Sequence, residues 1–200
     1  MARRVLSGAV AAALAFAAAA AAAPGPEPGD MALGRAAAPV TIFEYASVGC
    51  PHCADWDRDV FPEVKAKLID TGQARYVLRE MLNGDPTVAT GGFMVARCAG
   101  PQKYFAVVEA IFRRQGEMFE GRAGEVLREI AQQTGGLSEA SFDACLANSK
   151  GLDALTARVR QHGADKVETT PTFVIGEAKL EGYRTFAQIA EAVSAARRPR

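Results

Sequence analysis

Hydrophobic residues follow two different periodicities in the first part of the fold. Residues 40–45 are β-branched or aromatic except for Glu44, and they predict a strand. From Cys50 to Leu68 apolar residues recur every four positions, which predicts one helix that ends at residues 70–72. Residues 74–81 again have strand composition. This part of the chain therefore predicts a strand–helix–strand unit.

The middle of the chain is helical in pattern, with glycine or proline at most of the breaks. The predicted helices cover residues 87–99, 102–115, 123–133, 138–146 and 151–162. Ser138 is a candidate N-cap for the fourth of them. Strand composition returns at residues 170–176 and 178–183, and a last helix is predicted over residues 185–196. The order of elements predicts an α/β sheet domain with a helical insertion.

The N-terminus has the composition of an export signal. Arg3 and Arg4 precede an apolar stretch dominated by alanine, and a Pro-Gly-Pro sequence follows. This pattern predicts a signal peptide over residues 1–23 that is cleaved near its end. An uncleaved membrane anchor is the alternative, since the stretch is just long enough to span a bilayer. Residues 24–38, rich in proline, glycine and alanine, predict a linker.

The net charge of the chain bears on which classes of partner it could bind. The chain has 23 basic and 23 acidic residues, and loss of the two signal-peptide arginines leaves a net charge of about −2. Such a chain lacks the basic footprint of proteins that bind nucleic acid or an anionic membrane, so we expect neither partner. Export also bears on the four cysteines, because disulfides persist in oxidising compartments. Their unequal spacing suggests one close functional pair and one distant structural pair.

The close pair lies in the sequence Cys50-Pro51-His52-Cys53, where the first predicted strand gives way to the helix. Cys50 would be the helix N-cap and Pro51 the first helical residue, where proline loses no hydrogen bond. Unpaired backbone N–H groups and the positive end of the helix dipole would then favour the Cys50 thiolate. His52 would add a hydrogen bond or a positive charge. Cys53 would be the buried resolving thiol.

The Cys-Pro-His-Cys motif, the order of elements and a Thr-Pro pair before a late strand together resemble the DsbA-like thiol:disulfide oxidoreductases over most of the mature chain. The resemblance implies an α/β, thioredoxin-like fold with a helical-domain insertion. In that fold residues 39–82 and 165–197 would form the thioredoxin-like domain. Residues 83–164 would form the inserted helical domain.

The resemblance also implies roles for residues outside the motif. Pro171 would form a cis peptide bond with Thr170 and face the disulfide, where the backbone of Thr170 would pair with an extended substrate. A proline that only begins an edge strand is the alternative. Glu44 lies six residues before Cys50 and would carry protons to and from Cys53. Its alternative is an ordinary outward-facing strand residue.

Three residues outside this site have simpler interpretations. Cys98 and Cys145 fall on two predicted helices of the insertion, and we expect a structural disulfide between them. Two buried free thiols are the alternative. His162 ends a predicted helix and is expected to be solvated rather than to bind a ligand.

The predicted function is dithiol/disulfide exchange that introduces disulfide bonds into exported proteins in the periplasm. No cofactor or metal is required. The resemblance implies a membrane partner of the DsbB type that reoxidises the protein, and we expect a monomer. A disulfide isomerase or reductase is the first alternative, because threonine precedes Pro171. A metal-delivery module is the second, since four cysteines and two histidines offer ligands.

Overall fold

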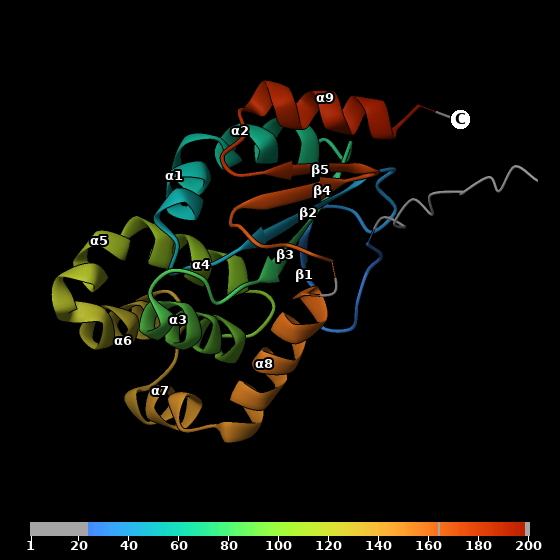
Figure 1. Ribbon diagram of the computed structural model, residues 1–200. Helices are drawn as coiled ribbons and strands as arrows, with labels where there is room; N and C mark the ends of the chain where they lie inside the picture. The colour runs from blue at the N-terminus through green and yellow to red at the C-terminus, as the bar shows by residue number, and fades with distance from the viewer. Residues whose placement is uncertain (1–23, 164, 199–200) are drawn as a thin grey trace, which may run out of the picture.

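A computed structural model describes residues 24–163 and 165–198, so the predicted signal peptide over residues 1–23 lies outside the described part. Its strands are β1 (Met31–Leu33), β2 (Thr41–Ala46), β3 (Arg75–Glu80), β4 (Thr172–Ile175) and β5 (Ala178–Glu181). They form one sheet in the order β1-β3-β2-β4-β5 (Figure 1). The strands β2 and β3 run parallel, and the other neighbouring pairs run antiparallel.

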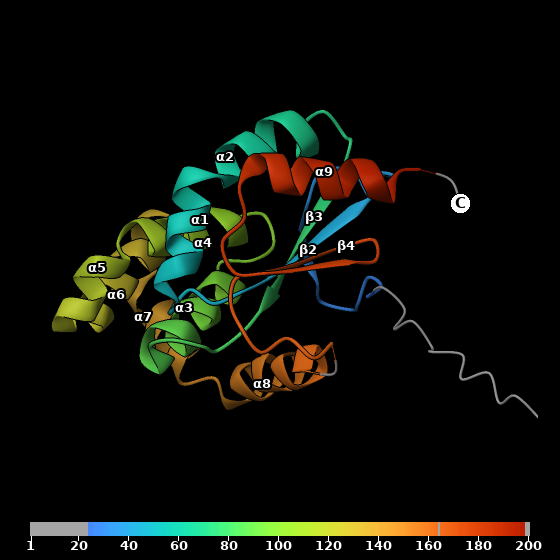
Figure 2. The same ribbon diagram turned by 45° about the horizontal axis from the view of Figure 1, so that its top comes forward.

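Helices cover both faces of this sheet and extend beyond one end. Their bounds are α1 (Pro51–Asp59), α2 (Phe61–Val64), η1 (Lys65–Ile69, a π-helix), α3 (Pro86–Cys98), α4 (Tyr104–Arg113), α5 (Gln115–Glu117), η2 (Met118–Arg122, a π-helix), α6 (Ala123–Gln133), α7 (Glu139–Leu146), α8 (Ser149–Gly163) and α9 (Phe186–Ala196). Figure 2 shows α2 and α9 over one face of the sheet and α8 below the other. Among the described residues no helix has both the length and the apolar character needed to cross a bilayer.

The central strand β2 is buried on both faces because helices cover both. Ile42 and Ala46 belong to the large core beneath α1 and α9, whereas Phe43 and Tyr45 belong to a second, smaller apolar cluster. Side chains alternate between the two faces of a strand, so Glu44 points to the same face as Ile42 and Ala46. This alternation places a carboxylate inside the larger core.

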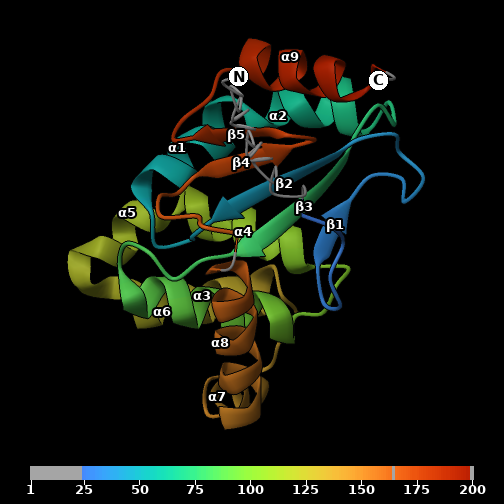
Figure 3. The same ribbon diagram turned by 45° about the vertical axis from the view of Figure 1, so that its right-hand side comes forward.

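The helices α3 to α7 form a block at the end of the sheet where β2 and β3 terminate (Figures 2 and 3). Within the block α3 packs against α4, α6 and α7. A disulfide joins Cys98 at the end of α3 to Cys145 in α7. Ser138 caps α7 and its side-chain oxygen accepts a hydrogen bond from the Ser141 N–H. The predicted cap is therefore confirmed.

The prediction of a linker over residues 24–38 is wrong in part, because β1 lies within this segment and pairs with the edge of β3. Two arginines hold the segment there: Arg79 donates to the carbonyl of Gly25 at 2.5 Å, and Arg97 to that of Gly29 at 2.7 Å. A strand of three residues is too short to show an alternating pattern, so tertiary pairing decides its conformation.

The helix predicted from Cys50 to Leu68 is interrupted at Val60, whose backbone leaves the helical region (φ −122°, ψ −41°). Pro62 explains the break, because proline has no N–H to donate and its ring clashes with the carbonyl four residues earlier. The apolar spacing continues across this break, so periodicity alone did not reveal it.

Candidate active site

The two close cysteines lie at the start of α1. This helix is the next element after β2 in the chain (Figure 1). Cys50 is the helix N-cap with an extended backbone, and Pro51 is the first helical residue. Both thiols are free, and both are buried: Cys50 is 7% exposed and Cys53 is fully buried. Pro51 and His52 lie between them at the surface. The exposed residues Pro51 and His52 therefore separate the cysteine pair from solvent.

The structure favours the thiolate form of Cys50. Its pKa falls from 9.0 to about 5, chiefly because the Cys53 thiol can donate a hydrogen bond to the Cys50 sulfur. Burial opposes this shift, whereas a hydrogen bond with Thr170 and the backbone N–H groups of Cys53 and His52 add to it. His52 acts here through its backbone, and a role for its exposed imidazole stays a prediction.

Cys53 and Glu44 form the buried side of the site. Burial raises the pKa of Cys53 well above 9.0, and hydrogen-bond donation to Cys50 and the nearby charge of Glu44 raise it further. Glu44 is 2% exposed, so it is not an outward-facing strand residue. Burial raises the pKa of Glu44 to about 8, although a short hydrogen bond from the Tyr76 hydroxyl lowers it. Glu44 can therefore hold or release a proton near neutral pH.

The third part of the site comes from a distant part of the chain. The peptide bond between Thr170 and Pro171 is cis, and this loop leads into β4. The Cys50 sulfur lies 3.4 Å from the carbonyl oxygen of Thr170. The carbonyl of Pro171 accepts a hydrogen bond from the Gly182 N–H at 2.8 Å, which ties the loop to the end of β5. The tertiary structure thus brings the Thr-Pro pair against the outer cysteine.

Two glycines that the sequence analysis did not single out allow the turn before Cys50 to pack tightly. A Cβ at Gly84 would lie 2.0 Å from the carbonyl oxygen of Gly49, and a Cβ at Gly49 would lie 2.4 Å from the carbonyl oxygen of Asp85. Gly84 also has a positive φ of 79°. Only glycine fits both positions, so the loop after β3 supports the turn that carries Cys50.

Two polar side chains hold the same turn in place, and no pattern in the sequence pointed to either of them. The Ser47 hydroxyl donates to the carbonyl of Asn83 at 2.6 Å. The buried Gln115 amide donates to the carbonyl of Val48 at 2.7 Å and so links the helical block to the active-site turn. Serine and glutamine occur at many surfaces, so only their burial here identifies them as positioning residues.

The prediction of a solvated His162 is wrong. This side chain is 3% exposed, and its Nδ1 lies 3.1 Å from the backbone carbonyl oxygen of Glu80. Its ring contacts Tyr45 edge-on, with centroids 6.0 Å apart. The helix α8 packs on β3, and this contact buries the ring. Helix periodicity could not show which strand the end of α8 would meet.

A family model described as Thioredoxin matches residues 27–195. A Rickettsia bellii protein named "Putative protein-disulfide oxidoreductase" is 31% identical over 157 residues, which cover 77% of this chain and 60% of that protein. "Disulfide bond formation protein D" of Bacillus subtilis is 20% identical over 169 residues, which cover 82% of this chain and 76% of that protein. The chain spans between 55% and 60% of the length of the Rickettsia relatives.

Similarity extends to solved structures. The crystal structure of Wolbachia pipientis α-DsbA1 matches with a TM-score of 0.78 and 25% sequence identity. The match covers 86% of this chain and 92% of that one. The thioredoxin-like fold expected from the sequence is therefore confirmed, including its helical insertion between β3 and β4.

Proposed function

Because this chain belongs to the thioredoxin family, we propose that it is an exported thiol:disulfide oxidoreductase that introduces disulfide bonds into other proteins. The observation that carries the proposal is the opposite shift of two adjacent thiol pKa values. Cys50 is ionised near neutral pH, whereas Cys53 stays protonated. Its similarity to proteins named for disulfide exchange supports the same reaction class. We place it in the periplasm, as a monomer that a membrane DsbB-type partner reoxidises.

The reaction starts from the oxidised protein. A substrate thiolate attacks the Cys50 sulfur, the Cys50–Cys53 bond breaks, and Cys53 leaves as a thiolate. Glu44 can give this thiolate a proton, because its own pKa lies near 8 and burial favours the neutral Cys53 thiol. The other thiolate of the same substrate then attacks the substrate sulfur of this mixed disulfide. The substrate disulfide forms, and the Cys50 thiolate leaves. The substrate loses two electrons and two protons. The protein gains both electrons and one proton, which Cys53 holds, and the other proton goes to solvent.

The leaving Cys50 thiolate explains why exchange would run toward substrate oxidation. It accepts hydrogen bonds from the Cys53 thiol and from the first backbone N–H groups of α1, and these bonds stabilise the reduced protein. The bond from the Cys53 thiol has no equivalent in the disulfide. A reduced state that is stabilised in this way makes the disulfide a stronger oxidant. The extended backbone before Pro171 is where we expect substrate to pair, because such pairing tolerates many sequences.

The equilibrium potential of Cys50–Cys53 tests the proposed direction. Trp56 provides the signal, because it is buried on α1 three residues after Cys53. Titration of the mature protein in glutathione buffers should give about −120 mV, the oxidising end of the family's range. A value near about −230 mV or lower would instead indicate a reductase or isomerase that needs an electron donor.

A Glu44→Gln variant tests the proton-transfer role. We expect exchange to slow about tenfold at pH 7, less than the full ~10²–10⁴ of general acid–base catalysis because solvent can also supply protons. Glutamine keeps the shape and can still accept the Tyr76 hydrogen bond, but it cannot transfer the proton. Stopped-flow measurements across pH 6–9 would record the rates, with the exposed Glu63→Gln as the control. Equal rates in Glu44→Gln and wild type at every pH would contradict the role.

A further inference from the structure

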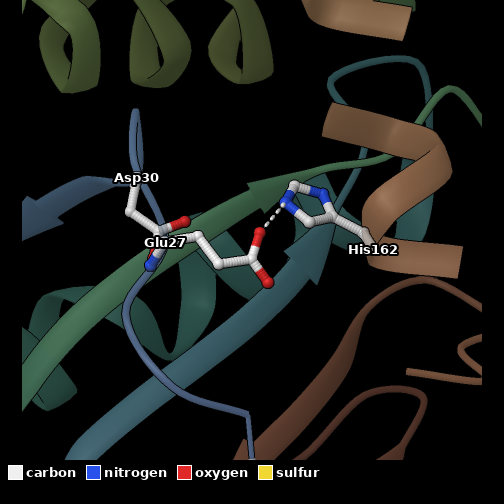
Figure 4. Close-up of side chains that lie close together, drawn as sticks. All are labelled: Glu27, Asp30 and His162. Atoms are coloured by element: carbon white, nitrogen blue, oxygen red, sulfur yellow. Dashed lines mark hydrogen bonds and ion pairs between the residues drawn. The ribbon is translucent and has the colours of Figure 1, made fainter. Parts of the chain in front are cut away.

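A second cluster of polar side chains lies away from the cysteines, between the N-terminal segment and the end of α8. Glu27 and Asp30 precede β1, and His162 comes from α8 (Figure 4). One potential ligand atom from each residue lies within 4.8 Å of the others. The side chains are 21%, 7% and 3% exposed, respectively. Two carboxylates and an imidazole from distant parts of the chain thus converge on one small space.

The hydrogen bonding of His162 fixes which nitrogen faces the cluster. Its Nδ1 lies 3.1 Å from the Glu80 carbonyl oxygen, which can only accept, so Nδ1 must carry the hydrogen. On the neutral ring Nε2 is then an acceptor, and the side chain that carries it is 3% exposed. Its neighbour in the cluster is Glu27 Oε2 at 3.8 Å, too far for a hydrogen bond and also an acceptor.

We propose that Glu27, Asp30 and His162 bind a divalent metal ion of the Zn²⁺ type. Imidazole and carboxylate are ligands that Zn²⁺ accepts, with Zn–N and Zn–O distances of about 2.0–2.2 Å. Two such bonds at the tetrahedral angle place N and O about 3.3–3.5 Å apart, so the 3.8 Å separation would close by about 0.3–0.5 Å when the ion binds. An N–H to carbonyl bond on the opposite ring nitrogen is typical of metal-binding histidines.

The positive charge of Arg79 argues against a second cation here, because this guanidinium already pairs with two of the proposed ligands. Its Nη2 lies 3.2 Å from Glu27 Oε1 and 3.7 Å from Asp30 Oδ2. However, Glu27 uses its other oxygen, Oε2, to face His162. Asp165 also pairs with Arg79, at 2.9 Å. Three carboxylates therefore surround one guanidinium, and a positive charge beside them is electrostatically favourable.

The neighbouring ion pairs offset part of this negative charge. Arg97 and Arg158 both pair with the single carboxylate of Glu80, so one surplus positive charge lies beside the cluster. The cluster together with the three arginines, Asp165 and Glu80 then has one excess negative charge. Either a metal ion or a proton on His162 would offset this charge. These two cations compete for the same Nε2 atom, and the experiment must separate them.

A metal ion at this site would fasten the N-terminal segment to the sheet and to α8. At present the segment is held by β1 pairing and by the bonds from Arg79 and Arg97 to backbone carbonyls. Metal binding would add a link between positions far apart in the sequence, as structural metal sites do. We therefore expect the ion to stabilise the fold rather than to take part in thiol exchange.

The test uses the mature protein with Cys50 and Cys53 oxidised, so that no free thiolate can take up metal. After treatment with a chelator, calorimetric titration with ZnCl₂ should show one ion bound per chain. Saturation should raise Tm by about 5–10 °C when free Zn²⁺ reaches roughly 100 times Kd. Zn²⁺ should also slow proteolysis of residues 24–34.

Three variants make the assignment specific. In His162→Asn the side-chain amide can still donate to the Glu80 carbonyl but offers no Nε2 ligand, and affinity should fall at least tenfold. Glu27→Gln should have a similar effect, and its partly exposed position makes it the safer variant for folding. Glu139→Gln, on the exposed face of α7, should bind as wild type does.

Several results would overturn the proposal. One is the absence of saturable Zn²⁺ binding, and another is equal binding by His162→Asn and wild type. Preferential Ca²⁺ binding that does not depend on His162 would also exclude this ligand set. If acidification stabilises the metal-free protein, His162→Asn abolishes that effect and Zn²⁺ has none, the cation at Nε2 is a proton instead.

Discussion

Replacing Cys50 with serine should destabilise the reduced protein by about 3 kcal/mol at pH 7 and by less than about 1 kcal/mol at pH 5. The pKa of Cys50 is depressed from 9.0 to about 5 in the folded protein. At pH 7 the Cys50 thiol is ionised in the folded protein and protonated in the unfolded protein. The pKa of Cys50 in the folded protein lies two units below this pH. Each unit is worth about 1.4 kcal/mol.

The pH window follows from the direction of the shift. Because the folded pKa is lower, this stabilisation is fully present above pH 9 and is lost as pH falls through about 5. Glu44 acts in the opposite sense: its pKa is raised to about 8, so its contribution falls as pH rises from 4.5 to 8. The difference between wild type and Cys50→Ser removes most of the Glu44 contribution, because the Cys50 charge is the smallest of the causes that raise the Glu44 pKa.

Urea unfolding of reduced wild type and reduced Cys50→Ser at pH 5, 6, 7 and 8 measures this difference. The oxidised wild type is the control, because its Cys50 sulfur cannot ionise. Serine also changes packing at a position that is 7% exposed, but that effect does not vary with pH. A difference in unfolding free energy that stays constant from pH 5 to pH 8 would show that Cys50 is not ionised at neutral pH.

Replacing Glu80 with glutamine should lower the free energy of unfolding by about 3–5 kcal/mol, the largest stability loss we expect from a single polar substitution. Glu80 is fully buried at the end of β3. It accepts hydrogen bonds from Arg97 at 2.6 Å, from Tyr104 at 3.0 Å and from Arg158 at 3.0 Å. Glutamine would leave two largely buried guanidinium groups without their carboxylate.

Thermal unfolding measures this loss, which corresponds to a Tm lower by about 10 °C for a domain of this size. The matched control is Glu139→Gln, which breaks an exposed pair with Arg128 and should cost about 1 kcal/mol or less. The partners of Glu80 lie on α3, α4 and α8, so the network attaches the helical block to the sheet. If Glu80→Gln and Glu139→Gln unfold at the same temperature, this network does not anchor the block.

Local patterns in the sequence were enough to predict most of the elements. Apolar periodicity located the helices of the insertion, and strand composition located β2 to β5. The position of Cys50 at the helix N-cap with Pro51 after it also followed from the sequence, because both depend on neighbouring residues only. Such features are encoded within a few positions, so one sequence suffices to infer them.

The tertiary structure decided what depends on residues far apart. The contact between Cys50 and Thr170 joins positions 120 residues apart, and sheet register and helix packing create it. Burial, not residue type, sets the pKa of Glu44 near 8. The packing of α8 on β3 turned an expected surface histidine, His162, into a buried group beside two carboxylates. Desolvation and long-range contacts arise only when the chain is folded, so no local pattern contained them.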